Sequence, residues 1–194
     1  MSDFRRVEPV YSYGRLARLE DRLAVLRWRR WQLRYPQLRG TGTLPLGAGS
    51  EVIVRGNGRI VVGAGVRARP DLTLSVQGLL TLGDRVFLGR GVNIACFDRV
   101  TIGADTRLAE RVSVHDANHV IEPLSDRATR AGSNIAAEVN IGERVWLAAN
   151  VVVVPGVTIG SDVVVGAGSV VTRDLPPGVL ASGVPATVRR PLRP

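Results

Sequence analysis

The stretch with the clearest potential for chemistry is residues 112–119, Val-Ser-Val-His-Asp-Ala-Asn-His, which holds the only two histidines of the chain. A neutral imidazole, with an ordinary pKa of about 6.5, can take a proton from a hydroxyl group near neutral pH. The stretch also interrupts a hydrophobic repeat that continues on both sides of it. Because the repeat breaks at the only histidines of the chain, this stretch suggests a functional site. The alternative is that His115 and His119 are ordinary polar residues near a loop.

The repeat that surrounds this stretch has a step of six residues. Three hexads and two further residues make a unit of 20, which occurs three times between Val62 and Ile121. Six more hexads follow, with first residues at Ile141, Leu147, Val153, Ile159, Val165 and Val171. Each hexad predicts one short strand and one sharp turn, and three hexads close a triangular coil with its first aliphatic residues inside. Because such coils pair their backbones with the coils above and below, the sequence predicts an all-β protein, a parallel β-helix of about six coils.

The pattern divides the chain into three parts. Residues 1–41 form a basic N-terminal segment, residues 42–176 form the β-helix, and residues 177–194 form a short basic tail. Residues 122–140 are rich in Arg, Ser, Asn and Ala and predict an external loop that protrudes from the β-helix. The coil that starts near Gly42 is the least regular one.

Residues 14–35 predict an amphipathic helix that ends before Pro36. Its apolar stripe follows the spacing of one helix face, with Leu16, Leu19, Leu23 and Leu26. We expect this stripe to pack on the side of the β-helix. The alternative is a peripheral contact with a membrane, because the helix is rich in Arg and carries Trp28 and Trp31.

Composition narrows the class of protein further. Aromatic residues make up only 5% of the 194 residues, so Val, Leu, Ile and Ala must build the core. The formal charge is +9, all basic residues are Arg, and the excess lies in residues 1–40, which carry a net +6. No nucleic-acid motif accompanies this charge, so we expect no nucleic-acid partner. The single Cys96, the absence of an apolar signal sequence and the absence of a long apolar stretch predict a cytoplasmic protein, either free or peripheral to a membrane.

Four segments carry a resemblance to a known family: Ile-Gly-Glu-Arg-Val-Trp-Leu-Ala-Ala-Asn at 141–150, Pro-Gly-Val-Thr-Ile-Gly at 155–160, Val-Gly-Ala-Gly-Ser-Val-Val-Thr at 165–172, and Gly-Val-Pro at 183–185. They resemble the C-terminal signature of the hexapeptide-repeat O-acetyltransferases, which include galactoside and maltose acetyltransferases and enzymes that acetylate bacterial polysaccharides and nodulation factors. The resemblance covers about residues 82–190. It implies a left-handed β-helix, a homotrimer, and acetyl-CoA bound in clefts between neighbouring subunits.

The resemblance also implies roles for single residues. His119 matches the catalytic histidine, and Trp146 matches a tryptophan that lines the active-site cleft. The residues that match coenzyme A contacts are Ala149, Ala167, Thr172, Arg173 and Arg190. Ala148 and Thr187 depart from the pattern, since the family usually has Gly at the first position and some members have Arg at the second.

The chemistry that follows from these residues is acetyl transfer. His119 would take the proton of an acceptor hydroxyl as its oxygen attacks the thioester, and would then protonate the leaving thiolate. A backbone N–H at Ala149 would hold the oxyanion. Asp116 and Asn118 are candidates for orienting the imidazole or binding the acceptor, with a turn residue as the alternative for Asp116. The reaction needs no metal and no covalent intermediate, and Cys96 is expected to be structural.

The remaining candidates concern the acceptor. His115 is the competing base and a candidate for binding the acceptor, and it is expected to point outward from its hexad. Glu122 either binds acceptor hydroxyls or is solvated. The N-terminal helix does not resemble the N-terminal module of the maltose and galactoside enzymes, which favours a polysaccharide or a lipid-linked saccharide as acceptor.

Two alternatives come from other classes of protein. A zinc-dependent enzyme of the gamma-type carbonic anhydrase kind requires three protein ligands, normally histidines; the chain has two histidines, and Asp116 would have to be the third ligand. A non-enzymatic β-helix scaffold would keep the hexads without needing His119 and Trp146, and both residues are present.

Overall fold

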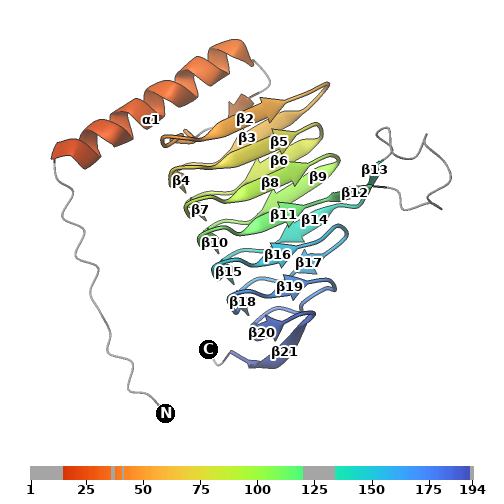
Figure 1. Cartoon of the computed structure of the whole chain (residues 1–194). Coiled ribbons are helices and arrows are strands. Elements are labelled where there is room, and N and C mark those ends of the chain that lie inside the picture. The colour runs from red at the N-terminus through yellow and green to blue at the C-terminus, as the bar shows by residue number, and fades with distance from the viewer. Residues whose placement is uncertain (1–14, 36–37, 41, 120–133, 193–194) are drawn as a thin grey trace.

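The computed structural model describes the chain in four stretches, residues 15–35, 38–40, 42–119 and 134–192. Most of it is a stack of triangular coils with one helix at the N-terminal end (Figure 1). Successive hexads contribute to three sheets in turn, which we call A, C and B in the order the chain visits them. All strand pairs between coils are parallel, as the repeat predicts.

The strands of the three sheets follow the hexads. Sheet A contains β1 (Leu38–Gly40), β3 (Arg59–Val62), β6 (Leu79–Leu82), β9 (Arg99–Ile102), β14 (Val139–Ile141) and β17 (Thr158–Ile159). Sheet B contains β2 (Glu51–Val54), β5 (Thr73–Val76), β8 (Asn93–Cys96), β11 (Ser113–His115), β16 (Val152–Val153) and β19 (Val170–Val171). Sheet C contains β4 (Arg67–Ala68), β7 (Phe87–Leu88), β10 (Arg107–Leu108), β15 (Trp146–Leu147), β18 (Val164–Val165), β20 (Val179–Gly183) and β21 (Ala186–Pro191). A fourth pair, β12 (Ala117–His119) and β13 (Asn134–Ala136), stands outside these sheets.

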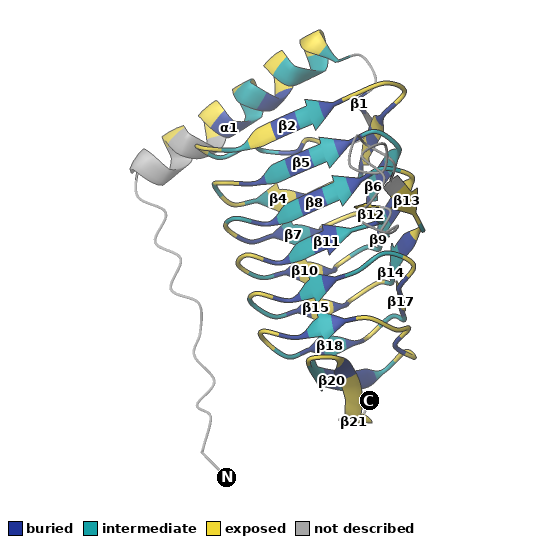
Figure 2. Cartoon of the chain, turned by 45° about the vertical axis from the view of Figure 1, so that its right-hand side comes forward, coloured by how far each residue is buried: buried dark blue, intermediate teal, exposed yellow. Residues whose placement is uncertain are grey.

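The core is a set of aliphatic columns inside the prism. In sheet B, for example, Ile94 lies in register with Val114, which lies in register with Val153, and all three are completely buried. Residues on either side of each such position face outward, so burial alternates along strands such as β8 and β9 (Figure 2). Burying an aliphatic side chain contributes about 1.5–3 kcal/mol, and the columns repeat this gain coil after coil. The predicted fold class, an all-β parallel β-helix with one helix, is confirmed.

Helix α1 (Arg15–Arg34) packs across the N-terminal end of the β-helix (Figure 1). Trp28 is buried to 1% exposure against the core, and the backbone N–H of Leu46 donates to the carbonyl of Ala24 at 3.2 Å. Docking of the helix on the domain is therefore confirmed. Within the described residues, no helix is both long and apolar enough to cross a membrane.

The predicted docking face of α1 was wrong. Leu19, Leu23 and Leu26 stay exposed at 53%, 36% and 53%, whereas Trp28 is buried and Trp31 and Tyr35 pack partly against the core. Both sets have the spacing of one helix face, and they lie on opposite sides of the helix. The aromatic set packs against the β-helix because burying the indole and phenol rings removes more apolar area from water than burying leucines does.

Three predicted boundaries also differ from the structure. Strand β1 belongs to sheet A, so the β-helix begins before Gly42. The excursion from the coil begins at Ala117 rather than at residue 122, and the chain has rejoined sheet A by β14 rather than after residue 140. Sheet C continues past residue 176, because β20 and β21 form an antiparallel hairpin that extends it.

Candidate functional site

The hairpin of β12 and β13 projects from the corner between sheets B and A (Figure 1). It is an insertion at that corner, since the N–H of Ala137 donates to the carbonyl of Asp116 at 2.7 Å and closes the coil behind it. His119 ends β12 opposite Asn134 and is exposed to solvent. Asn118 is exposed as well, opposite Ile135. Glu122, a predicted acceptor-binding residue, lies outside the described residues.

The carboxylate of Asp116 is completely buried at the base of this hairpin. One carboxylate oxygen accepts the N–H of Phe97 at 2.7 Å, and the other accepts the N–H of Asp98 at 2.8 Å. These two bonds hold the corner of the preceding coil. The geometry therefore gives Asp116 a defined structural role, as a turn residue, at the place where the hairpin leaves the β-helix.

His115 lies on the outer face of β11, as predicted, and is half-buried. Its Nε2 is 2.7 Å from the hydroxyl oxygen of Ser113, two residues earlier on the same face. Burial lowers the pKa of His115 from its ordinary value of 6.5, and the negative charge of Asp116 opposes that shift. His115 is consequently a neutral imidazole near pH 7.

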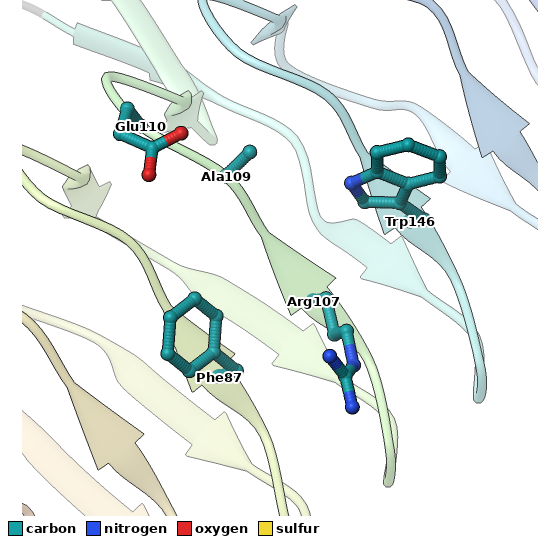
Figure 3. Close-up of a pocket in the computed structure, with 5 residues that line it drawn as sticks. All are labelled: Phe87, Arg107, Ala109, Glu110 and Trp146. Atoms are coloured by element: carbon teal, nitrogen blue, oxygen red, sulfur yellow. The ribbon is translucent and has the colours of Figure 1, made fainter. Parts of the chain in front are cut away.

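A hollow of about 440 Å³ opens on the outer face of sheet C (Figure 3). Its floor contains Phe87, Arg107 and Trp146, which lie in register on the adjacent strands β7, β10 and β15. Ala109 and Glu110 complete the lining, and Trp146 is 51% exposed. Phe87, Arg107 and Glu110 were not among the site residues predicted from the sequence. The signal that would have found the first two is their shared position, directly before the buried first residue of a hexad.

The corner between sheets C and B borders this hollow. The N–H of Asn150 donates to the carbonyl of Glu110, and the N–H of Gly168 donates to the carbonyl of Ala149, both at 2.9 Å. Glu110, Ala149 and Ala167 therefore stack in one column along the corner. Ala149 is half-buried and Ala167 is exposed, and both have small side chains.

Arg190 continues the column of Trp146 toward the C-terminal end. Trp146 is in register with Val164, Val164 with Leu180, and Leu180 with Arg190. Three strand steps of ~4.8 Å place the backbone of Arg190 about 14 Å from that of Trp146. The exposed guanidinium of Arg190 donates to the carbonyl of Pro191 at 3.1 Å.

Thr172 and Arg173 lie on the opposite side of sheet B. They follow β19 directly, at the corner between sheets B and A, and both are exposed. This is the corner from which the hairpin of His119 projects in an earlier coil. The candidate residues thus form two groups. Trp146, Ala149, Ala167 and Arg190 belong to sheet C and its corner with B, while His119, Asn118, Thr172 and Arg173 belong to the corner of B with A.

The residues of a metal centre do not gather in the described part of the chain. No group of three or more His, Cys, Asp or Glu side chains is placed there so as to hold a metal ion. Cys96 is buried inside the coil, and burial raises the pKa of its thiol to about 12. A thiol in that state is a poor nucleophile, which fits the structural role predicted for it.

The fold and the repeat together define a hexapeptide-repeat β-helix. Residues 138–173 match the family model described as "Bacterial transferase hexapeptide (six repeats)". The putative colanic acid biosynthesis acetyltransferase WcaF of Escherichia coli K12 is 37% identical over 129 residues, which cover 66% of this chain and 68% of that protein. The putative lipopolysaccharide biosynthesis O-acetyl transferase WbbJ of the same organism is 37% identical over 145 residues, 70% of this chain and 73% of that protein.

A solved structure has the same fold. The hexapeptide-repeat acetyltransferase of Vibrio cholerae, complexed with acetyl-CoA, superposes with a TM-score of 0.55 at 23% identity and covers 96% of this chain and 94% of that one. The chain belongs to the hexapeptide-repeat acetyltransferase family, and it is an acyltransferase. The resemblance inferred from the sequence is confirmed.

Proposed function

We propose that the protein transfers an acetyl group from acetyl-CoA to a hydroxyl of a saccharide, in a cleft that two neighbouring subunits of a homotrimer form together. The observation that carries the proposal is the separation of the candidate residues into two groups on opposite edges of sheet B. One chain does not bring His119 to Trp146. A threefold arrangement that sets the His119 edge of one subunit against the sheet C edge of the next would unite them.

The surface of sheet C suits the donor substrate. The hollow beside Trp146 offers an apolar wall for an extended thioester arm, and the guanidinium of Arg190 offers a positive charge about 14 Å further along for the phosphates. Ala149 and Ala167 would present backbone groups to the amides of the arm. Thr172 and Arg173 of the neighbouring subunit would approach the nucleotide end.

His119 would act as general base from the adjoining subunit. One ring nitrogen accepts the hydroxyl proton while the acceptor oxygen forms its bond to the thioester carbon. The carbon–sulfur bond then breaks, and the same imidazole returns the proton to the thiolate sulfur. The backbone N–H of Ala149 would stabilise the charge on the carbonyl oxygen, a contribution worth ~10² or more in rate. Holding both substrates in one cleft would supply much of the remaining acceleration.

The acceptor we propose is a polysaccharide or a lipid-linked saccharide. The names of WcaF and WbbJ refer to colanic acid and to lipopolysaccharide biosynthesis, and the chain covers more than two thirds of each. Asn118, Glu122 and His115 are the side chains proposed to contact acceptor hydroxyls. The Ser113–His115 pair gives that surface both a donor and an acceptor of hydrogen bonds.

Release of free thiol from acetyl-CoA, measured across a panel of saccharide acceptors, tests this function. His119→Ala should lower the rate by ~10²–10⁴ and leave coenzyme A binding almost unchanged. His115→Ala is the matched control and should cost less than ~10-fold. If His115→Ala abolishes turnover and His119→Ala does not, the base is misassigned. If neither substitution matters, or no saccharide stimulates thiol release, the proposed reaction is wrong.

A further inference from the structure

Helix α1 presents a second apolar face that no part of the chain described by the structure covers. Leu19, Leu23, Leu26 and Leu33, which we call the leucine stripe, are exposed at 53%, 36%, 53% and 85%. With about 3.6 residues per turn, the stripe lies on the opposite side of the helix from Trp28. Exposed residues recur along the described part of α1 in Figure 2. A helix with one face docked needs no leucines on its other face for stability.

Arginines flank the leucine stripe on the same exposed surface. Arg22, Arg29, Arg30 and Arg34 all have exposed side chains. The sequence contains no Asp or Glu between Asp21 and Glu51, so the part of α1 that bears these arginines is purely basic. An apolar stripe bordered by cations is complementary to a partner that has an apolar layer beneath negatively charged surface groups.

A hollow of about 340 Å³ adjoins this surface near the C-terminal end of α1. It is lined by Arg27, Arg30, Trp31 and Arg34. Trp31 stacks on Tyr35 with ring centroids 5.3 Å apart, and the guanidinium of Arg34 lies 5.8 Å from the Tyr35 ring centroid. Among the described residues, no carboxylate forms an ion pair with Arg30 or Arg34. The guanidinium groups of Arg30 and Arg34 provide donors of the kind that a phosphate group requires, while Nη1 of Arg27 donates to the carbonyl of Leu46 at 3.2 Å.

We propose that α1 docks the protein on an anionic lipid bilayer. The leucine stripe would enter the boundary between headgroups and acyl chains, and the arginines would meet lipid phosphates, one of them in the hollow beside Trp31. Because α1 carries seven arginines in its 20 residues, it would lie in the plane of the interface. Trp28, on the opposite face, keeps the β-helix attached to the docked helix.

The placement of α1 adds a consequence that rests on the proposed function. The helix closes the N-terminal end of the β-helix (Figure 1), and rotation about a threefold axis would leave all three copies at the same level. Once one helix is bound, the other two are held at a high effective concentration near the same bilayer, so three weak contacts together give stronger binding than one. The enzyme would meet a lipid-linked saccharide at the surface where that acceptor resides.

Co-sedimentation of the full chain with lipid vesicles tests the proposal. We expect binding to vesicles of phosphatidylglycerol and phosphatidylcholine, weaker binding to phosphatidylcholine alone, and loss of binding in high salt. The double variant Leu26→Gln/Leu33→Gln should weaken binding at least ~10-fold, because it removes two apolar side chains from the contact and leaves Trp28 in place. Arg29→Gln/Arg30→Gln should also weaken it about tenfold or more.

The matched control is Arg111→Gln/Arg189→Gln, which removes the same charge from exposed positions on later coils, farther from α1. It should change vesicle binding less than ~threefold, since charges act within about a Debye length of the membrane. Equal losses in both arginine variants would show that net charge alone drives binding and would overturn the proposal. An absence of vesicle binding would also overturn the proposal. In that case, dissociation of the oligomer by the leucine variant in sedimentation would mark the stripe as a subunit contact. Vesicle binding requires neither coenzyme A nor saccharide, so its failure would leave the proposed acetyl transfer standing.

Discussion

Asp116 provides the sharpest test of how the hairpin is anchored. Its carboxylate is completely buried and accepts two backbone N–H groups, at 2.7 and 2.8 Å. A hydrogen bond to a charged group is worth ~1.5–3 kcal/mol, and Asp116→Ala removes two while relieving the cost of burying the charge. We therefore expect the free energy of unfolding to fall by about 3 kcal/mol. At about 2–4 °C per kcal/mol for a chain of this size, Tm should fall by roughly 6–12 °C.

Thermal unfolding followed by circular dichroism, at one protein concentration, measures the effect. Asp174→Ala is the matched control, because its exposed carboxylate accepts one backbone N–H, from Thr158, at 2.7 Å. That variant should lose no more than about 1 kcal/mol. Similar Tm values for the two variants would refute the structural role of Asp116. An Asp116→Ala variant that keeps its Tm and its coenzyme A affinity but loses turnover would instead place Asp116 in the chemistry.

Three further predictions concern the core and its titrating groups. Trp28→Ala should lower the free energy of unfolding by about 3–5 kcal/mol in chemical denaturation, whereas Leu33→Gln on the exposed face should change it by less than ~0.5 kcal/mol. Because the folded pKa of His115 lies below 6.5, the unfolded chain protonates first as pH falls through 6.5, so folding stability should decrease until the folded pKa is passed. His115→Gln should flatten that decrease in a series of unfolding curves, and an unchanged pH dependence would contradict it. The Cys96 thiol, with its pKa raised to about 12, should react with a disulfide reagent only after unfolding, and fast labelling of the folded protein would refute its burial.

The β-helix was predictable because every hexad repeats the same pattern of buried and exposed residues. A buried aliphatic such as Val114 recurs at a fixed step, and the backbone can pair only with the coils on either side. The point of departure at Ala117 was not predictable, because Val120 stands six residues after Val114 and keeps the sequence in phase. The departure point is marked by the carboxylate of Asp116, which accepts the N–H groups of Phe97 and Asp98 in the preceding corner, a contact between residues far apart in the sequence.

The prediction of the docking face of α1 was wrong for a related reason. Leucines and aromatics each form a stripe on the helix, and spacing alone does not say which stripe meets the β-helix. The hollow beside Trp146 was only partly anticipated, because Phe87 and Arg107 come from other coils and carry no motif of their own. The residues carried over from the family lie on sheet C, on its corner with sheet B, and on the corner of sheet B with sheet A. Their division between two edges of sheet B is visible only once the coils are stacked.

The central claim is that His119 of one subunit and Trp146 of the next complete one cleft. Subunit complementation tests it directly, by co-expressing His119→Ala and Trp146→Ala chains and assaying the mixed trimers for thiol release. If the cleft is shared, an interface between an intact His119 and an intact Trp146 re-forms in about a quarter of the sites of a random trimer, and about a quarter of wild-type activity should return. If both residues serve a site within one chain, the mixture will be as inactive as the two separate variants, and the account of a shared cleft is wrong.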